Sequence, residues 1–208
     1  RSVDSLGYGD YLFEVMLHDS DVVIYSRGYC NLFGEWQTTP EAETVTKGFN
    51  ESVIMPYPKE LVDVAFYMRD YNGDFIEKMR LVINPNDYFI QDAPKFSHSI
   101  LNVYGDYAPD KAVDIVILPD GYTQEEMGKF VIDCNFFKEC LFSYDPYISY
   151  KDRFNIRAVM APSKDSGVSI PAEDVWKNTA VNCSFYTFDS ERYCMSYDNQ
   201  SIRNLAGM

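Results

Sequence analysis

The feature that most constrains the fold is a short apolar stretch that runs directly into a turn and then a helix. Residues 113–118 are almost all aliphatic, which is typical of a strand covered on both faces. Pro119-Asp120-Gly121 follows, and Thr123 has Glu126 three residues later, the arrangement of a capping box. The pattern predicts a buried strand, a turn and a helix over about residues 124–142. In α/β domains, a turn at the carboxyl end of a strand is where sites usually form.

A second strand is predicted after this helix, over residues 155–160. A strand, a helix and a strand in this order form a βαβ unit, in which the two strands lie parallel in one sheet. The polar loop over residues 162–171 then fits either a substrate-facing loop or a plain surface loop. Turn-forming residues gather over positions 105–110. We therefore predict that residues 109–208 are the first part of an α/β domain of catalytic type.

The residues before this boundary are typical of β-structure. Apolar and polar side chains alternate over residues 11–17, and strands at 62–69 and 75–83 are joined through Asn72-Gly73. Asn-Gly is the strongest short hairpin signal and is typical of a type I′ turn. Further short strands are predicted over residues 22–25, 31–37, 52–56 and 100–104. Strands at this spacing predict an antiparallel β-sandwich over residues 1–108, and hence an α+β chain overall.

Composition excludes several classes of protein. The chain of 208 residues is 46% hydrophobic, which is enough to build cores and argues against wholesale disorder. It carries 32 acidic and 18 basic residues, a formal net charge of −14, so nucleic acid is not an expected partner. No apolar run reaches the length of about 18 residues that a membrane-spanning helix needs, and no signal-peptide pattern opens the sequence.

Direct candidates for a metal or catalytic site are few. Asp70, Asn72 and Asp74 resemble the start of a calcium loop, but the Gly and Glu that such a loop needs later are not in place. A hairpin turn is therefore favoured there. The two histidines, His18 and His98, lie outside any HExxH motif. Both are predicted to belong to the first domain, in exposed or capping roles.

The five cysteines leave the redox state of the chain open. Cys134 and Cys140 are six residues apart on one predicted helix, so their Cα atoms would lie about 9 Å apart, too far for a disulfide. Cys183 and Cys194 flank a segment rich in Tyr and Phe, and they could be bridged if that segment forms a hairpin. Free buried thiols are the favoured alternative, and Cys30 is predicted to be a small core residue. Without a CxxC motif, a zinc site made of thiolates is not supported.

Several blocks of sequence occur in a recognisable order. In the second half of the chain they are ILPDGYTQEEMGKF (117–130), RFNIRAV (153–159), SGVSIP (166–171) and SFYTFDSERY (184–193). In the first half they are YGDYLFEV (8–15), YSRGY (25–29) and LFGEWQTTPEA (32–42). Together these blocks resemble the IgA-peptidase-type zinc metallopeptidases secreted by gut bacteria, in which a β-rich domain precedes the catalytic domain. The resemblance runs over nearly the whole chain.

The resemblance implies a secreted or cell-surface zinc peptidase whose catalytic helix carries HExxH, two histidines binding zinc and the glutamate acting as general base. In the family that helix lies downstream of these blocks, and this chain ends at Met208 before reaching it. No catalytic residue and no zinc ligand is therefore assigned, and Asp120 and Tyr122 are interpreted as fold-forming. We expect the chain alone to be inactive and without zinc, and to associate with the missing carboxyl-terminal segment.

The leading hypothesis is thus the amino-terminal portion of a zinc metallopeptidase acting on protein or peptide substrates, with immunoglobulin A suggested only by the family name. The alternative is a non-catalytic β-sandwich module that binds protein or glycan. Solvent-facing Tyr residues or Trp36 on one sheet face would favour binding, whereas buried aromatic side chains would favour the peptidase. An independent serine or cysteine hydrolase is disfavoured, because neither histidine is placed beside a nucleophile.

Overall fold

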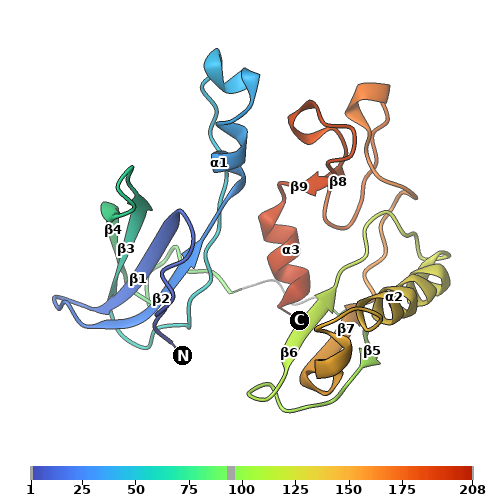
Figure 1. Cartoon of the computed structure of the whole chain (residues 1–208), viewed down its shortest axis with the longest axis horizontal. Helices are drawn as coiled ribbons and strands as arrows, with labels where there is room; N and C mark the ends of the chain where they lie inside the picture. The colour runs from blue at the N-terminus through green and yellow to red at the C-terminus, as the bar shows by residue number, and fades with distance from the viewer. Residues whose placement is uncertain (1, 93–96, 208) are drawn as a thin grey trace. The chain divides into compact units, whose positions relative to one another are not determined.

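The computed structural model describes residues 2–92 and 97–207, and the chain divides into two compact units (Figure 1). The amino-terminal unit extends to Asp92, and the carboxyl-terminal unit contains the rest of the chain. Helices and antiparallel pairs of strands occur together, so the predicted α+β class is confirmed.

One four-stranded antiparallel sheet forms the amino-terminal unit, in the order β2-β1-β3-β4. Its strands are β1 (Tyr11–Leu17), β2 (Val23–Tyr29), β3 (Val62–Arg69) and β4 (Phe75–Ile83). Phe13 and Val15 of β1 are buried together with Val62 and Val64 of β3, because alternate residues of a strand share one face. The connection between β2 and β3 packs against this apolar face through Val53.

The amino-terminal unit is antiparallel, as predicted, but its described residues form one sheet where a sandwich would have two. Three predicted strands account for the difference. Residues 31–37 contain a helix, residues 52–56 pack on the sheet without forming a strand, and residues 100–104 belong to the other unit. A short apolar run has the same pattern in a strand and in a segment that covers one, so periodicity alone does not separate them.

Helix α1 (Leu32–Trp36) forms where a strand was predicted, and a short 3-10 helix, η1 (Pro40–Glu43), follows it. Asn31 caps α1, because its side chain accepts a hydrogen bond of 3.2 Å from the backbone of the helix. Phe33 and Trp36 stack with ring centroids 5.7 Å apart, a contact that residues three apart make on one face of a helix. The cap and the stacked rings together favour the helix over extended backbone.

The hairpin between β3 and β4 forms over residues 70–74, as predicted. The Asp70 carboxylate accepts hydrogen bonds from the N–H groups of Asn72 and Asp74, each at 2.9 Å. The likeness to a calcium loop therefore reflects a carboxylate that closes its own turn. Gly73 has a φ of +91°, but Asn72 has no positive φ. The turn is thus not of the expected type I′, which needs positive φ at both central residues.

The carboxyl-terminal unit contains a three-stranded sheet in the order β5-β7-β6. Its strands are β5 (Ile100–Tyr104), β6 (Val113–Ile117) and β7 (Phe154–Val159), with β6 parallel and β5 antiparallel to β7. Helix α2 (Met127–Leu141) connects β6 to β7, so the predicted βαβ unit is confirmed. The remaining elements are η2 (Ile148–Arg153), η3 (Pro171–Glu173), β8 (Cys183–Ser184), η4 (Thr187–Asp189), β9 (Met195–Ser196) and α3 (Asn199–Ala206).

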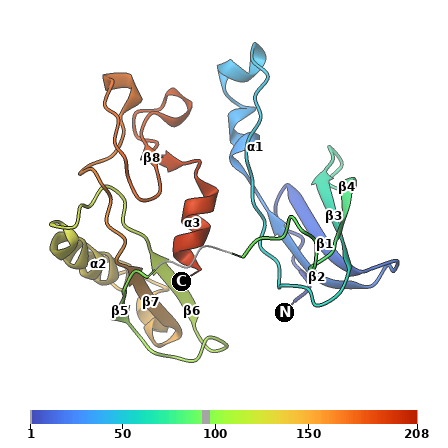
Figure 2. The same cartoon turned by 180° about the vertical axis from the view of Figure 1, so that it is seen from behind.

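Helix α2 covers one face of this sheet, as Figure 1 and Figure 2 show. Met127, Phe130 and Cys134 of the helix are buried against Ala158 of β7. The other face is covered mainly at one end, where α3 packs. Strand β6 was predicted to be covered on both faces, but its Val116 is 41% exposed in the described structure.

The two units divide earlier than the domain boundary predicted at residue 108. Strand β5 lies before that boundary in the sequence, yet it pairs with β7. Its apolar pattern is like that of the strands before it, and only its pairing partner reveals where it belongs. The unit that contains the βαβ motif therefore includes β5 as its antiparallel edge strand.

Candidate functional site

The predicted turn lies at the carboxyl end of β6, where Asp120 and Gly121 follow the strand. Gly121 has a φ of +73°, and a Cβ there would lie 2.4 Å from the carbonyl oxygen of Gly167, so only glycine fits without displacement. The N–H of Gly167 donates a hydrogen bond to the carbonyl oxygen of Gly121 at 2.8 Å. The turn is therefore in direct contact with the loop over residues 162–171.

The Asp120 carboxylate is the centre of a hydrogen-bond network. It accepts hydrogen bonds from Val181 N at 2.8 Å, from Thr179 Oγ1 at 3.0 Å and from Cys183 N at 3.1 Å. A carboxylate has about four lone-pair positions, and these three donors take most of them. Asp120 thus fixes residues 179–183 against the end of β6, which is a structural role.

Ser163 plays the same part on the other side of the turn. Its hydroxyl oxygen accepts hydrogen bonds from Gly121 N at 3.0 Å and from Ala180 N at 2.9 Å, while its own N–H donates to Tyr122 O at 2.7 Å. The residue is 7% exposed. Because both lone pairs of the hydroxyl are taken by backbone donors, Ser163 is a structural bridge and a poor nucleophile.

Glu126 ties the loop over residues 162–171 to the beginning of α2. Its carboxylate accepts hydrogen bonds from Thr123 N at 2.8 Å and from Ser166 Oγ at 2.7 Å. The N–H of Thr123, followed by the Ser166 hydroxyl, holds the pKa of Glu126 below its usual value. Tyr122 donates its hydroxyl hydrogen to Asp133 Oδ2 at 2.8 Å, and burial raises the pKa of this tyrosine. Each of these polar side chains is committed to the fold.

The two cysteines near the network are poor nucleophiles. Burial, followed by the negative charge of Asp120, raises the pKa of the Cys183 thiol to about 12. Burial also raises the pKa of the Cys194 thiol. Because the thiolate is the reactive form of cysteine, thiols that stay protonated at neutral pH do not suit nucleophilic catalysis. The arrangement disfavours a cysteine hydrolase.

The two histidines lie in different units, whereas the sequence-based boundary placed both in the first domain. His18 follows β1, with its Nδ1 atom 2.8 Å from Asp63 Oδ1 and its Nε2 atom 3.5 Å from Asp19 Oδ2. The hydrogen bond to Asp63 raises the pKa of His18. His98 instead belongs to the carboxyl-terminal unit, because it directly precedes β5.

His98 lines a small pocket that lies where β7 ends. Its volume of about 170 Å³ is less than the 300 Å³ or so typical of ligand pockets, so it suits a group of side-chain size. The residues that line it come from four separate segments, which explains why sequence patterns did not reveal it. They are His98, Ala161, Pro162, Ala180, Ser201 and Leu205.

The residues present do not fit the zinc ion that the resemblance implies. Within residues 2–92 and 97–207, no group of three or more His, Cys, Asp or Glu side chains is placed to hold a metal ion. His18 is paired with carboxylates in one unit, and His98 lines a mostly apolar pocket in the other. We therefore derive no catalytic step through zinc from these residues.

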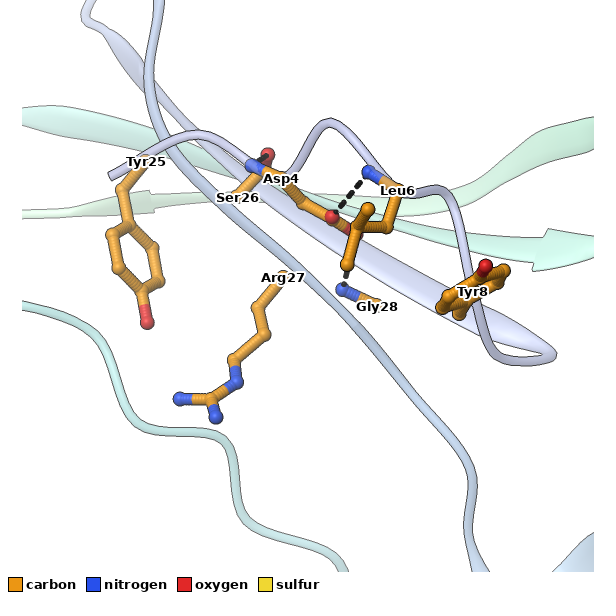
Figure 3. Close-up of a pocket in the computed structure, with 7 residues that line it drawn as sticks. All are labelled: Asp4, Leu6, Tyr8, Tyr25, Ser26, Arg27 and Gly28. Carbon is orange, nitrogen blue, oxygen red and sulfur yellow. Dashed lines mark hydrogen bonds between the residues drawn. The ribbon is translucent and has the colours of Figure 1, made fainter. Parts of the chain in front are cut away.

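A larger pocket, with a volume of about 460 Å³, lies on the amino-terminal unit (Figure 3). It forms where the first residues of the chain run beside β2, held there because the Asp4 carboxylate accepts a hydrogen bond from Gly28 N at 3.2 Å. Figure 3 shows Arg27 and Tyr25 projecting from the same strand, while Tyr8 is 74% exposed. The lining residues are Asp4, Leu6, Tyr8, Tyr25, Ser26, Arg27 and Gly28.

Fold and site together define an α+β chain in which a β-rich unit precedes a βαβ unit, with loops organised at the carboxyl end of a parallel strand. The models of two known families match these two parts. Residues 1–80 match the Peptidase M64 N-terminus, and residues 101–208 match IgA Peptidase M64. The second match alone covers more than half of the chain, so the protein belongs to this metallopeptidase family. No curated protein matches the sequence.

Proposed function

We propose that this chain supplies the β-rich domain and the first part of the peptidase domain of a zinc metallopeptidase that acts on protein or peptide substrates. The observation that carries the proposal is the match of residues 101–208 to the peptidase family. The organised turn at Asp120 falls within that match. In this proposal the zinc ligands come from residues that the chain does not contain, because its sequence has two histidines and no HExxH motif.

The network around Asp120 supports a positioning role for this part of the chain. Asp120, Ser163 and Glu126 hold residues 162–171 and 179–183 at the carboxyl end of β6. Loops in this position shape the substrate-binding side of α/β enzymes. We infer that these loops line the approach to the reaction centre and that their polar side chains are positioning residues.

The family also guides the proposal on location and substrate. We propose that the peptidase works outside the cell or on its surface, that it comes from a gut bacterium, and that immunoglobulin A is a candidate substrate named by the family description. The remaining carboxyl-terminal part of the peptidase domain is the expected partner of this chain. Among the helices that the structure describes, none is long and apolar enough to cross a membrane.

The test compares the 24.0 kDa chain with the longest natural product that contains its sequence. We expect the 24.0 kDa chain to hold no stoichiometric zinc after dialysis and to cleave no protein. The longer product should hold one zinc ion per chain and cleave casein in a reaction that 1,10-phenanthroline blocks. Tightly bound zinc with chelator-sensitive cleavage by the short chain would contradict our placement of the zinc ligands. A longer product that binds zinc and cleaves no protein would contradict the peptidase function.

A second candidate function, binding of protein or glycan, rests on the pocket at Arg27. The Arg27 guanidinium shares the pocket with the Asp4 carboxylate, whose pKa is lowered first by the Leu6 N–H and also by the charge of Arg27. With Tyr8 and Tyr25, Arg27 can bind a carboxylate-bearing group on the side away from Asp4. Trp36 does not contribute an aromatic platform, since it is 4% exposed. Calorimetric titration with sialylated and neutral glycans, and with acidic peptides, tests this candidate. Binding that survives Arg27→Ala unchanged would remove it.

A further inference from the structure

Strands β8 and β9 form a small antiparallel hairpin beside the Asp120 network. Cys183 pairs with Ser196, and Ser184 pairs with Met195. Cys194 lies two residues before Ser196, so it is on the same face of the hairpin as Cys183 and diagonal to it. Each thiol affects the pKa of the other, as expected of neighbouring side chains. The hairpin therefore brings onto one face two cysteines that are eleven positions apart in the sequence.

We propose that Cys183 and Cys194 are a disulfide site, bridged when the protein meets an oxidant such as glutathione disulfide. One cysteine, in the small fraction that is thiolate, attacks the glutathione disulfide, forms a mixed disulfide and releases one glutathione thiol. Because the pKa values of both thiols are raised, this reaction is slow at neutral pH and faster at alkaline pH. The second cysteine sulfur then displaces the other glutathione. The two protein thiols are oxidised to one disulfide, and their two hydrogens and two electrons end on two molecules of reduced glutathione. This inference does not depend on the proposed peptidase function.

The other three cysteines do not offer the same arrangement. Cys134 and Cys140 lie on α2 six positions apart, which separates them by about 9 Å along the helix axis. Cys30 is exposed in the amino-terminal unit, where its sulfur lies 3.9 Å from an oxygen of Asp10. Among the described cysteines, only Cys183 and Cys194 lie on one face of the same hairpin.

A bridge at this position would restrain a strained loop. Three residues of the loop that are not glycine have left-handed backbone conformations, which cost free energy. They are Tyr186 (φ +63°), Phe188 (φ +56°) and Asp189 (φ +57°). The loop begins at Cys183, whose N–H is held by Asp120. A disulfide would join Cys194, at the other end of the loop, to Cys183. It would thereby reduce the conformational entropy that the loop gains when it unfolds.

The direct test is to map the disulfide. The folded chain is incubated with glutathione disulfide, transferred to denaturant, treated with iodoacetamide, digested and analysed by mass spectrometry. Before oxidation all five cysteines should be alkylated, and afterwards the digest should contain one cross-linked peptide that joins Cys183 to Cys194. Glutathione attached to the exposed Cys30 is recognised by its added mass. Five alkylated cysteines after oxidation, or a bridge from Cys183 to any other cysteine, would overturn the proposal.

Two variants and a second readout sharpen this test. Cys140→Ser should still give the cross-linked peptide of Cys183 and Cys194 on oxidation, whereas Cys194→Ser should give no cross-linked peptide. Limited proteolysis within residues 185–193 should be slower by about tenfold in the oxidised protein, and dithiothreitol should restore the original rate, because cleavage follows local opening. Equal cleavage rates in the oxidised and reduced protein would overturn the inference that the bridge restrains the loop.

Discussion

The two units differ in what holds their connecting segments in place. In the amino-terminal unit, the connection between β2 and β3 lies on the sheet through apolar contacts, such as that of Val53 with the core around Phe13. In the carboxyl-terminal unit, the loops after β7 are held by polar side chains, chiefly Asp120 and Ser163, which accept hydrogen bonds from backbone N–H groups. The first kind of contact is shared among many side chains, and the second is concentrated in two.

This difference bears on what each unit is suited to do. Apolar packing stabilises a sheet without fixing every loop that crosses it, because it is not directional. A carboxylate that satisfies several backbone donors fixes a loop in one position and leaves its outer side free to meet another molecule. The comparison therefore predicts that single substitutions destabilise one unit at a time, by different physical routes.

The largest effect is expected from Phe13→Ala in the apolar core of the amino-terminal unit. Phe13 is 2% exposed, and removing a buried phenyl ring costs about 3–5 kcal/mol of unfolding free energy. Hydrogen exchange followed by mass spectrometry should show lost protection in β1 and β3 and none in β6 and β7. Phe89→Ala, at a residue that is 83% exposed, is the matched control. Equal loss of protection in both units would show that they unfold together and would break the comparison.

A smaller effect is expected from Asp120→Ala in the carboxyl-terminal unit. The substitution leaves Val181 N, Cys183 N and Thr179 Oγ1 without their acceptor, and each unsatisfied buried donor costs about 1–3 kcal/mol. We expect a net loss of about 3 kcal/mol in urea unfolding, with protection lost first over residues 179–183. Asp110→Ala, whose side chain is 72% exposed, should change stability little. If Asp120→Ala changed the free energy of unfolding as little as Asp110→Ala does, water would be replacing the carboxylate as the acceptor of these hydrogen bonds.

The elements that the sequence predicted correctly carry local signals. Asn72-Gly73 indicated the hairpin, and the apolar run at 113–118 with its capping residues indicated the βαβ unit. The Asp120 network carries no such signal, because its partners lie 59 to 63 positions away and two of them are backbone N–H groups, which any residue supplies. The same limit explains why the sequence placed β5 in the first domain. Its partner strand β7 begins only at Phe154, and the residues of β5 do not specify that partner.

Two glycines with positive φ allow a matched test of contact against conformation. At Gly121 a Cβ would lie 2.4 Å from Gly167 O, whereas at Gly73 it would meet nothing within 4 Å. Gly73→Ala should therefore cost only the strain of left-handed backbone, about 1 kcal/mol. Gly121→Ala adds the displacement of the loop and should cost about 2–3 kcal/mol in urea unfolding. Equal costs would show that backbone conformation alone sets the requirement for glycine.

The smallest effect expected is a pH dependence of the amino-terminal unit. The hydrogen bond between His18 and Asp63 raises the pKa of the histidine and lowers that of the carboxyl. The folded chain thus holds the His18 proton more tightly than the unfolded chain, in which its pKa is about 6.5. The contribution of His18 is fully present below that pH and is lost as the pH rises through the raised pKa of the folded state. That of Asp63 is present above about pH 4 and is lost as the pH falls through its lowered pKa.

Urea unfolding of the wild type and of His18→Gln across the neutral range measures this contribution. As the pH rises from about 6.5 through the raised pKa of His18, the wild type should lose stability relative to the variant, because only the wild type gives up a proton that the fold had stabilised. His98→Gln should keep the wild-type pH dependence in the amino-terminal unit, since His98 belongs to the other unit. Superimposable pH profiles for the wild type and His18→Gln would mean that the pair of His18 and Asp63 adds nothing measurable to the free energy of unfolding. Apolar packing would then stabilise the amino-terminal unit to an even greater degree than the comparison with the Asp120 network implies.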